Sequence, residues 1–113
     1  MAILSRENIE SADDGKMTTV EVPEWGGEVG IRTLTGLERE SLLASIAGEE
    51  DGIGYQGAIL VRTICDGDGE RLFADDESDQ VMAKAATSLH RLYKAAIEWN
   101  RLDGGDEEEL EKN

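Results

Sequence analysis

The sequence predicts an α+β fold: an N-terminal β-hairpin, then a small, mainly helical bundle and an acidic flexible tail. Apolar and polar residues alternate near the start of the chain, as in a half-buried strand, and from residue 35 apolar residues recur at helical spacing. Six of the last eight residues are charged, which disfavours a packed core there. We therefore divide the 113 residues into an N-terminal arm (1–15), one globular domain (16–102) and a tail (103–113).

The arm and the hairpin come first. Leu4 to Asp14 has the pattern of a short helix or turn capped by Ser5. Lys16 to Val22 alternates, with Val20 and Val22 on one face, and the alternation resumes after residues 23–27, Pro-Glu-Trp-Gly-Gly. A hairpin over 16–34 is the simplest interpretation, with the glycines supplying positive φ in its loop.

Residues 35–102 are expected to form helices joined by a loop and a turn. Thr35-Gly-Leu-Glu38 has the form of a capping box, and apolar residues follow at helical spacing until Gly48. An acidic, glycine-rich loop is expected at 49–54, and a second, nearly apolar helix runs from Ala58 to Cys65. A turn at 66–69 precedes Arg71-Leu-Phe73, which returns the chain to the core. The longest helix is expected from Asp76 to Leu102, with this apolar stripe: Val81, Met82, Ala85, Leu89, Leu92, Tyr93, Ala96 and Trp99.

Charge restricts the possible partners. The chain has 26 acidic and 11 basic residues, so its net charge is −15. Such a surface repels phosphate backbones and anionic lipid, which disfavours nucleic-acid and membrane partners. Cys65 is the only cysteine, so no internal disulfide can form. Without an apolar run of signal-peptide or membrane-spanning length, we expect a cytoplasmic protein.

Two loops resemble ligand-binding motifs. Gly52-Ile-Gly54-Tyr-Gln-Gly57 matches the dinucleotide pattern, but a helical segment precedes it and three neighbouring acids would repel phosphates, so a loop is favoured. Asp66, Asp68, Glu70 and Glu77 match positions 1, 3, 5 and 12 of a calcium loop. Position 6, where a glycine is needed, is Arg71, so a tight turn is favoured over cation binding at Asp66–Glu77.

No group of residues has the composition of a catalytic centre. Cys65 and His90 are each the only residue of their type, and they cannot build a structural zinc site. Cys65 is expected in the core and His90 at the edge of a helix. The sequence therefore predicts no enzyme, no metal site and no cofactor. Trp25 and Trp99 could anchor a partner, although capping the small core is the simpler role for both.

The order of segments resembles the tail assembly chaperones of long-tailed (siphovirus-type) bacteriophages. The resemblance covers nearly all of the chain. Its parts are Val20-Glu-Val-Pro-Glu-Trp-Gly-Gly27, Leu34-Thr-Gly-Leu-Glu-Arg39, Arg71-Leu-Phe73, Leu89-His-Arg-Leu-Tyr-Lys-Ala-Ala96 and Glu108-Glu-Leu-Glu-Lys-Asn113.

The resemblance implies a chaperone that binds the tape measure protein in the cytoplasm of the infected bacterial host. It keeps that client soluble until tail tube subunits assemble around it, and it is absent from the mature virion. A longer form made by programmed frameshifting is implied to recruit the tail tube protein. Glu111-Lys112-Asn113 can be encoded by a slippery A-AAA-AAC heptamer, which permits such a frameshift without establishing it.

We expect the client to lie in a groove between the long helix and the second helix. The candidate contacts are Leu89, Leu92, Tyr93 and Trp99, together with Trp25, although packing inside the domain is the simpler role for Leu89 and Leu92. Repeated copies along a client would suit a homo-oligomer. Two other functions stay open: an acidic DNA mimic that inhibits a nucleic-acid-binding enzyme, and a structural adaptor in the virion.

Overall fold

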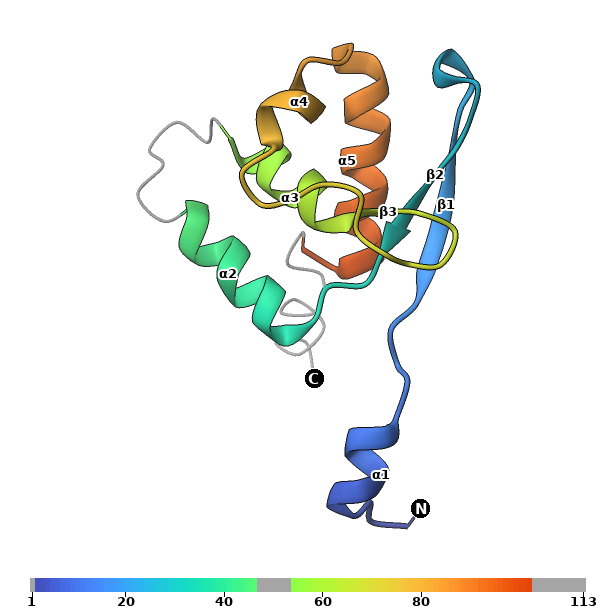
Figure 1. The fold of residues 1–113 in the computed structure, drawn as a ribbon, viewed down its shortest axis with the longest axis vertical. Helices are drawn as coiled ribbons and strands as arrows, with labels where there is room; N and C mark the ends of the chain where they lie inside the picture. The colour runs from blue at the N-terminus through green and yellow to red at the C-terminus, as the bar shows by residue number, and fades with distance from the viewer. Residues whose placement is uncertain (1, 47–53, 103–113) are drawn as a thin grey trace, which may run out of the picture.

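The computed structural model describes residues 2–46 and 54–102 (Figure 1). Residues 49–53 of the predicted loop at 49–54 and the predicted acidic tail lie outside the described residues. The elements, in chain order, are α1 (Arg6–Ser11), β1 (Met17–Val22), the 3₁₀ turn η1 (Pro23–Trp25), β2 (Gly27–Arg32), α2 (Gly36–Ile46), α3 (Tyr55–Thr63), β3 (Ile64–Cys65), α4 (Ser78–Met82) and α5 (Ala86–Asn100).

The predicted α+β class and the hairpin are confirmed. β1 and β2 pair antiparallel from Met17↔Arg32 to Val22↔Gly27. Only Gly26 of the two loop glycines has positive φ (82°). The sheet has a third strand that the sequence did not predict, because Ile64 and Cys65 leave the helical path and pair with Ile31 and Gly30 of β2.

The core lies between one face of the hairpin and the helices α3 and α5. In a strand, alternate residues share a face, and Val22 and Ile31 on that face are fully buried. In Figure 1, α5 runs alongside α3 and the hairpin. The largest buried contributions of the helices are Leu42, Ile59, Leu60, Val61, Leu89 and Leu92.

The expected single helix over 76–102 is wrong. Helix α4 ends at Met82, Ala85 is extended (φ −62°, ψ 137°), and α5 begins at Ala86. Helix α4 packs on α3, where an added Cβ on Gly57 would come within 2.9 Å of the Cβ of Ser78. Residues 82–87 contain neither glycine nor proline, so packing against α3, rather than a local breaker residue, is the reason for the interruption.

Both predicted capping motifs are present, but they lead into helices that differ in burial. Thr35 and Glu38 exchange hydrogen bonds with each other's backbone N–H, at 3.1 and 2.9 Å, and start α2. Helix α2 buries Leu42, whereas Leu37 is 81% exposed. Ser5 and Asn8 cap α1, which buries no residue and lies apart from the other elements at the end of an extended segment (Figure 1).

Candidate protein-binding groove

A groove of about 490 Å³ lies beside the sheet, and part of its lining (Val29, Ile64, Phe73 and Val81) belongs to the core or packs against it. Its floor is the sheet, one wall is the hairpin tip, and the other wall is formed by residues 66–73 and α4. Most of its lining is apolar, with Glu28, Asp66 and Lys84 as charged lining residues. The large apolar residues around it are Met17, Trp25, Val29, Ile64, Leu72, Phe73 and Val81.

The floor depends on the absence of a side chain at Gly30. The register places Met17, Thr19 and Gly30 on the groove face. A Cβ at Gly30 would lie 2.8 Å from Sγ of Cys65 and 2.9 Å from Cε of Met17. Any larger residue would therefore push β3 away from β2 or fill the groove. Burial raises the pKa of the Cys65 thiol, which favours the neutral form.

Trp25 forms one wall because the hairpin tip is fastened to α5. Pro23 begins the 3₁₀ turn, and Gly26 ends it in the left-handed region at φ 82°. Glu24 accepts hydrogen bonds from the two terminal nitrogens of Arg91, at 2.9 and 3.1 Å, and from Ser88 Oγ at 3.2 Å. The hydrogen bond from Arg91 lowers the pKa of Glu24 to about 2. The carboxylate therefore stays charged and keeps Trp25 at the groove.

Leu72 and Phe73 form the opposite wall. Asp66 Oδ1 accepts hydrogen bonds from the backbone N–H groups of Asp68 (2.9 Å) and Glu70 (3.0 Å), and this closes the turn before them. Leu72 N–H then donates to the carbonyl of Ile64 at 3.2 Å. The prediction that the segment 71–73 returns to the core is wrong for Leu72, which is 55% exposed, whereas Phe73 packs partly buried against the core.

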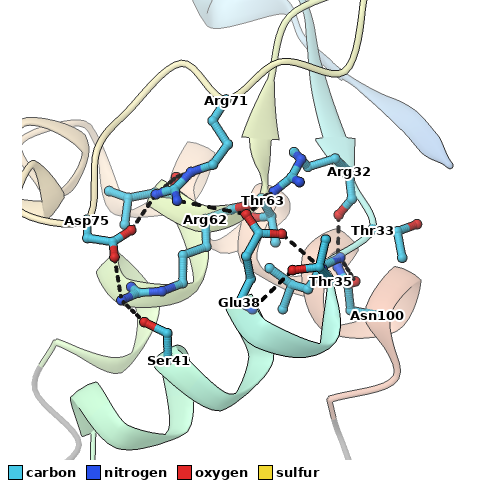
Figure 2. Close-up of polar contacts among 12 residues, drawn as sticks. Arg32, Thr33, Thr35, Glu38, Ser41, Arg62, Thr63, Arg71, Asp75 and Asn100 are labelled. Atoms are coloured by element: carbon cyan, nitrogen blue, oxygen red, sulfur yellow. Dashed lines mark hydrogen bonds and ion pairs between the residues drawn. The ribbon is translucent and has the colours of Figure 1, made fainter. Parts of the chain in front are cut away.

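An arginine cluster, consisting of Arg32, Arg62, Arg71, Glu38 and Asp75, holds this wall in place (Figure 2). Arg71 donates to the carbonyl of Val61 and to Asp75 (2.7 Å), and Arg62 forms an ion pair with Asp75 at 3.3 Å. Arg32 donates to Glu38 and to the carbonyl of Arg62, each at 2.9 Å. The cluster thus ties the segment around Asp75 to α2, α3 and β2.

The same contacts keep the carboxylates of the arginine cluster ionised. The hydrogen bond from Arg71 lowers the pKa of Asp75. Burial of Glu38 acts to raise its pKa, but hydrogen bonds from Arg32 and from the backbone of Thr35 outweigh burial, and the pKa is lowered. Arg62 is almost fully buried and also donates to the carbonyl of Ala58 at 3.0 Å. Its charge is paired, as a buried charge must be.

The five candidate contact residues do not form one surface. Leu89 and Leu92 are buried in the core, so the expected groove between α3 and α5 is filled by their side chains. Tyr93 is partly buried and packs edge-on against Tyr55, with ring centroids 6.2 Å apart. Trp25 and Trp99 are each 39% exposed, but only Trp25 lines the large groove. Trp99 lines two smaller hollows near the C-terminal end of α5.

Sequence reasoning did not assign Met17, Leu72 or Phe73 to a binding surface. Leu72 and Phe73 are expected from the sequence to return to the core, and the strand alternation places Met17 on the face opposite to Val20 and Val22 without indicating a binding surface. Only the pairing of β3 with β2 brings them together.

The loop that resembles a calcium site uses its carboxylates on its own backbone. Asp66 caps its own turn, and Glu77 Oε1 accepts a hydrogen bond from the N–H of Ala74. Across residues 2–46 and 54–102, no three His, Cys, Asp or Glu side chains come together in a way that could hold a metal ion. Gly52 lies outside the described residues, whereas Gly54 precedes α3 in the left-handed region and Gly57 is buried inside α3.

In the described part of the chain, none of the helices is both long enough and apolar enough to cross a membrane.

Comparison with known proteins identifies the family. The family profile described as phage tail assembly chaperone matches residues 5–113. Among solved structures, the tail assembly chaperone of bacteriophage HK97 has a similar fold, with a TM-score of 0.58 at 22% sequence identity, over 80% of this chain and 88% of that chain. No curated protein sequence matches the chain significantly. Because the profile spans almost the whole sequence, the chain belongs to the family of phage tail assembly chaperones.

Proposed function

We propose that this protein binds the tape measure protein, keeps it soluble and helps to recruit tail tube subunits during tail assembly. It acts without catalysis, in the cytoplasm of the infected host, and it is absent from the mature virion. The family supports the chaperone role, and the groove supports a role in binding a polypeptide. The single observation that carries the proposal is an open apolar groove on a chain with a net charge of −15.

The groove suits an amphipathic segment of the client. Trp25 and Leu72 expose apolar surface. Covering this surface with an apolar side chain of the client removes it from water and lowers the free energy of the complex. The acidic exterior favours client segments whose apolar stripe is flanked by lysine and arginine. Once the stripe is covered, the repulsive surface of the complex opposes aggregation. Client binding therefore combines an apolar contact with a long-range attraction that salt weakens.

Coexpression with the tape measure protein of the same phage tests the proposal. The wild-type chain should increase the soluble fraction of the client, and Trp25→Ala and Leu72→Ser should lose most of this effect. Trp99→Ala and Leu37→Ser are matched controls, because Trp99 has the same exposure as Trp25 and Leu37 is exposed on α2. If the two controls and the two groove variants behave alike, the groove is not the client site.

Three further measurements distinguish the alternatives. Mass spectrometry of purified particles should find no copies, whereas a virion adaptor would be present in them. The protein should not displace DNA from a nuclease, whereas a DNA mimic would. Sequencing the coding DNA at Glu111-Lys112-Asn113 tests the frameshift, because only some of the codons for these residues contain the slippery A-AAA-AAC heptamer.

A further inference from the structure

We propose that the outer edge of β1 is a second binding surface, which takes an extended segment of a partner protein as an added antiparallel strand. The segment carries a bulky apolar side chain, with lysine or arginine two residues before and after it. The open backbone edge and a hollow beside Trp99 carry this inference. Trp99 and Ala95 line the hollow but not the groove, so the inference goes beyond the proposed function and does not depend on it.

The edge of β1 has open backbone groups. In the strand order β1-β2-β3, β1 is the outer strand (Figure 1). Thr33 N–H donates to the carbonyl of Lys16 at 2.8 Å, which makes these two residues a hydrogen-bonded pair. Such pairs alternate along an antiparallel ladder, so the N–H and C=O groups of Met17 and Thr19 point outward. In the described part of the chain, no hydrogen bond reaches these outward groups.

The stretch Met17–Val20 lacks the features that protect a strand edge. Natural edge strands are guarded by charged side chains, prolines or bulges. This stretch has none of them, because it reads Met-Thr-Thr-Val and its register with β2 is continuous. Threonine and valine are β-branched and favour strands. Lys16 and Glu21 flank the stretch, so the open edge is short and fits a short segment.

A hollow of about 280 Å³ lies between this edge and α5. Its lining consists of Thr18, Thr19, Val20, Ala95, Glu98 and Trp99. Residues directly opposite each other on paired strands share a face. Because Thr18 lines the hollow, the added residue opposite Thr18 directs its side chain into the hollow. A bulky apolar side chain there covers Trp99, which is 39% exposed, and removes apolar surface from water.

Contacts at both ends of α5 hold the hollow in place. Near the hairpin tip, Arg91 donates to Glu24 at 2.9 Å. At the other end, Asn100 Oδ1 accepts a hydrogen bond from Leu34 N–H (2.8 Å), and its Nδ2 donates to the carbonyl of Arg32 (3.1 Å). Helix α5 is thus fixed to the hairpin before a partner arrives. A pre-formed site loses less entropy on binding than a mobile one does.

The charges around the hollow favour a basic segment. Glu98 is the charged residue of the lining, and Glu21 ends the open edge. Residues two apart on a strand share a face, so a lysine or arginine two residues from the apolar one lies on the same side as Glu98. The net charge of −15 adds a long-range attraction for a basic segment. The same charge opposes pairing of this edge with a second copy of the chain.

Binding of a synthetic peptide to the full chain tests the inference. The probe is the acetylated, amidated peptide Thr-Lys-Thr-Phe-Thr-Lys-Thr, in which phenylalanine and both lysines share one face. Amide hydrogen exchange, followed by NMR, should be slow at Thr18 and Val20 without the peptide. With about 1 mM peptide, exchange at Met17 and Thr19 should slow at least about tenfold. Unchanged exchange at these two residues overturns the proposal.

N-methylated peptides separate strand addition from a simple apolar contact. Methyl groups on the nitrogens of the two threonines that flank phenylalanine remove the donors that face β1, and they should abolish binding. A methyl group on the phenylalanine nitrogen points away from β1 and should change the affinity by less than about twofold. If both methylated peptides lose binding equally, the segment does not bind as a strand.

Two tryptophan substitutions locate the site. Trp99→Ala should weaken peptide binding at least about tenfold, because it removes the apolar surface beside the hollow. Trp25→Ala removes an equally exposed side chain from the groove and should bind the peptide as wild type does. An equal loss in both variants would place the peptide in the groove and overturn the proposal. Circular dichroism verifies that both variants are folded.

The same exchange measurement detects a competing occupant. If protection of Met17 and Thr19 appears without peptide and increases with protein concentration, the edge pairs with a second copy, and the proposal is wrong. The tape measure protein is absent from every sample. Failure of this inference therefore leaves the proposed function to its own coexpression test.

Discussion

The position of the hairpin tip depends on the contacts of one side chain, Glu24. Glu24 connects a 3₁₀ turn to a helix more than sixty residues later, through Arg91 and Ser88. The sequence gives no sign of this pairing, because Glu24 is one of 26 acids and Arg91 one of 11 bases. What it does reveal is the local chemistry of the tip: proline where φ is fixed, and glycine at Gly26, where φ is positive.

The Glu24 pairing makes the stability depend on pH. The pKa of Glu24 is lowered from 4.5 to about 2 in the folded chain, so its stabilising contribution is complete above pH 4.5 and is lost as the pH falls towards 2. The free energy of unfolding, measured by urea titration, should decrease more steeply between pH 4.5 and 2 in wild type than in Glu24→Gln. In an Arg91→Gln background, the same Glu24 substitution should change the slope less. Equal slopes in wild type and Glu24→Gln would show that the contact is not formed in solution.

The helices and strands agree with the sequence prediction where local capping signals are strong. They differ from it where packing against another element favours a different conformation. The capping pairs Ser5/Asn8 and Thr35/Glu38 start helices in the structure. Residues 64–65 follow an apolar helix but become β3, since the edge of β2 offers them hydrogen-bond partners. In the same way, the stripe predicted over 76–102 is shared between α4 and α5, which pack in different places.

Burial separates two leucines that look alike in sequence. Leu92 of α5 is fully buried and Leu37 of α2 is exposed. Leu92→Ala should lower the free energy of unfolding by about 2–5 kcal/mol, because it removes core contacts and leaves a cavity. Leu37→Ala should change it by less than about 0.5 kcal/mol. Chemical denaturation measures both, and a small effect of Leu92→Ala would return that residue to the list of candidate contacts.

Two features describe the molecule as a whole: its large negative net charge and its exposed N-terminal arm, residues 2–15. A net charge of −15 on a small chain repels phosphate and opposes aggregation. The arginine cluster is a local exception, because three of the 11 basic residues gather where they hold the wall of the groove. The arm extends the molecule and leaves Ile3, Leu4 and Ile9 exposed.

Self-repulsion should make the folded chain more stable in salt. Compact folding brings like charges together, and salt screens them. The urea midpoint at pH 7 should therefore rise as NaCl increases from about 0.01 to 0.3 M. Sucrose at equal osmolarity is the control for changes in solvation. A midpoint that falls with salt would mean that the ion pairs of the arginine cluster outweigh the repulsion.

The sequence by itself determined the α+β class, the hairpin, the Ser5 cap, the capping box at Thr35–Glu38, the acidic character and the chaperone family. These depend on periodicity, on local backbone chemistry and on ordered segments, all of which are properties of neighbouring residues. It also pointed to Trp25. Only the tertiary structure decided that Leu89 and Leu92 are covered, that Leu72 is exposed, and that Trp25 and Trp99 lie on different surfaces. The physical reason is that burial depends on which elements meet, and a short β3 pairing with β2 opens a groove that no pattern along the chain encodes.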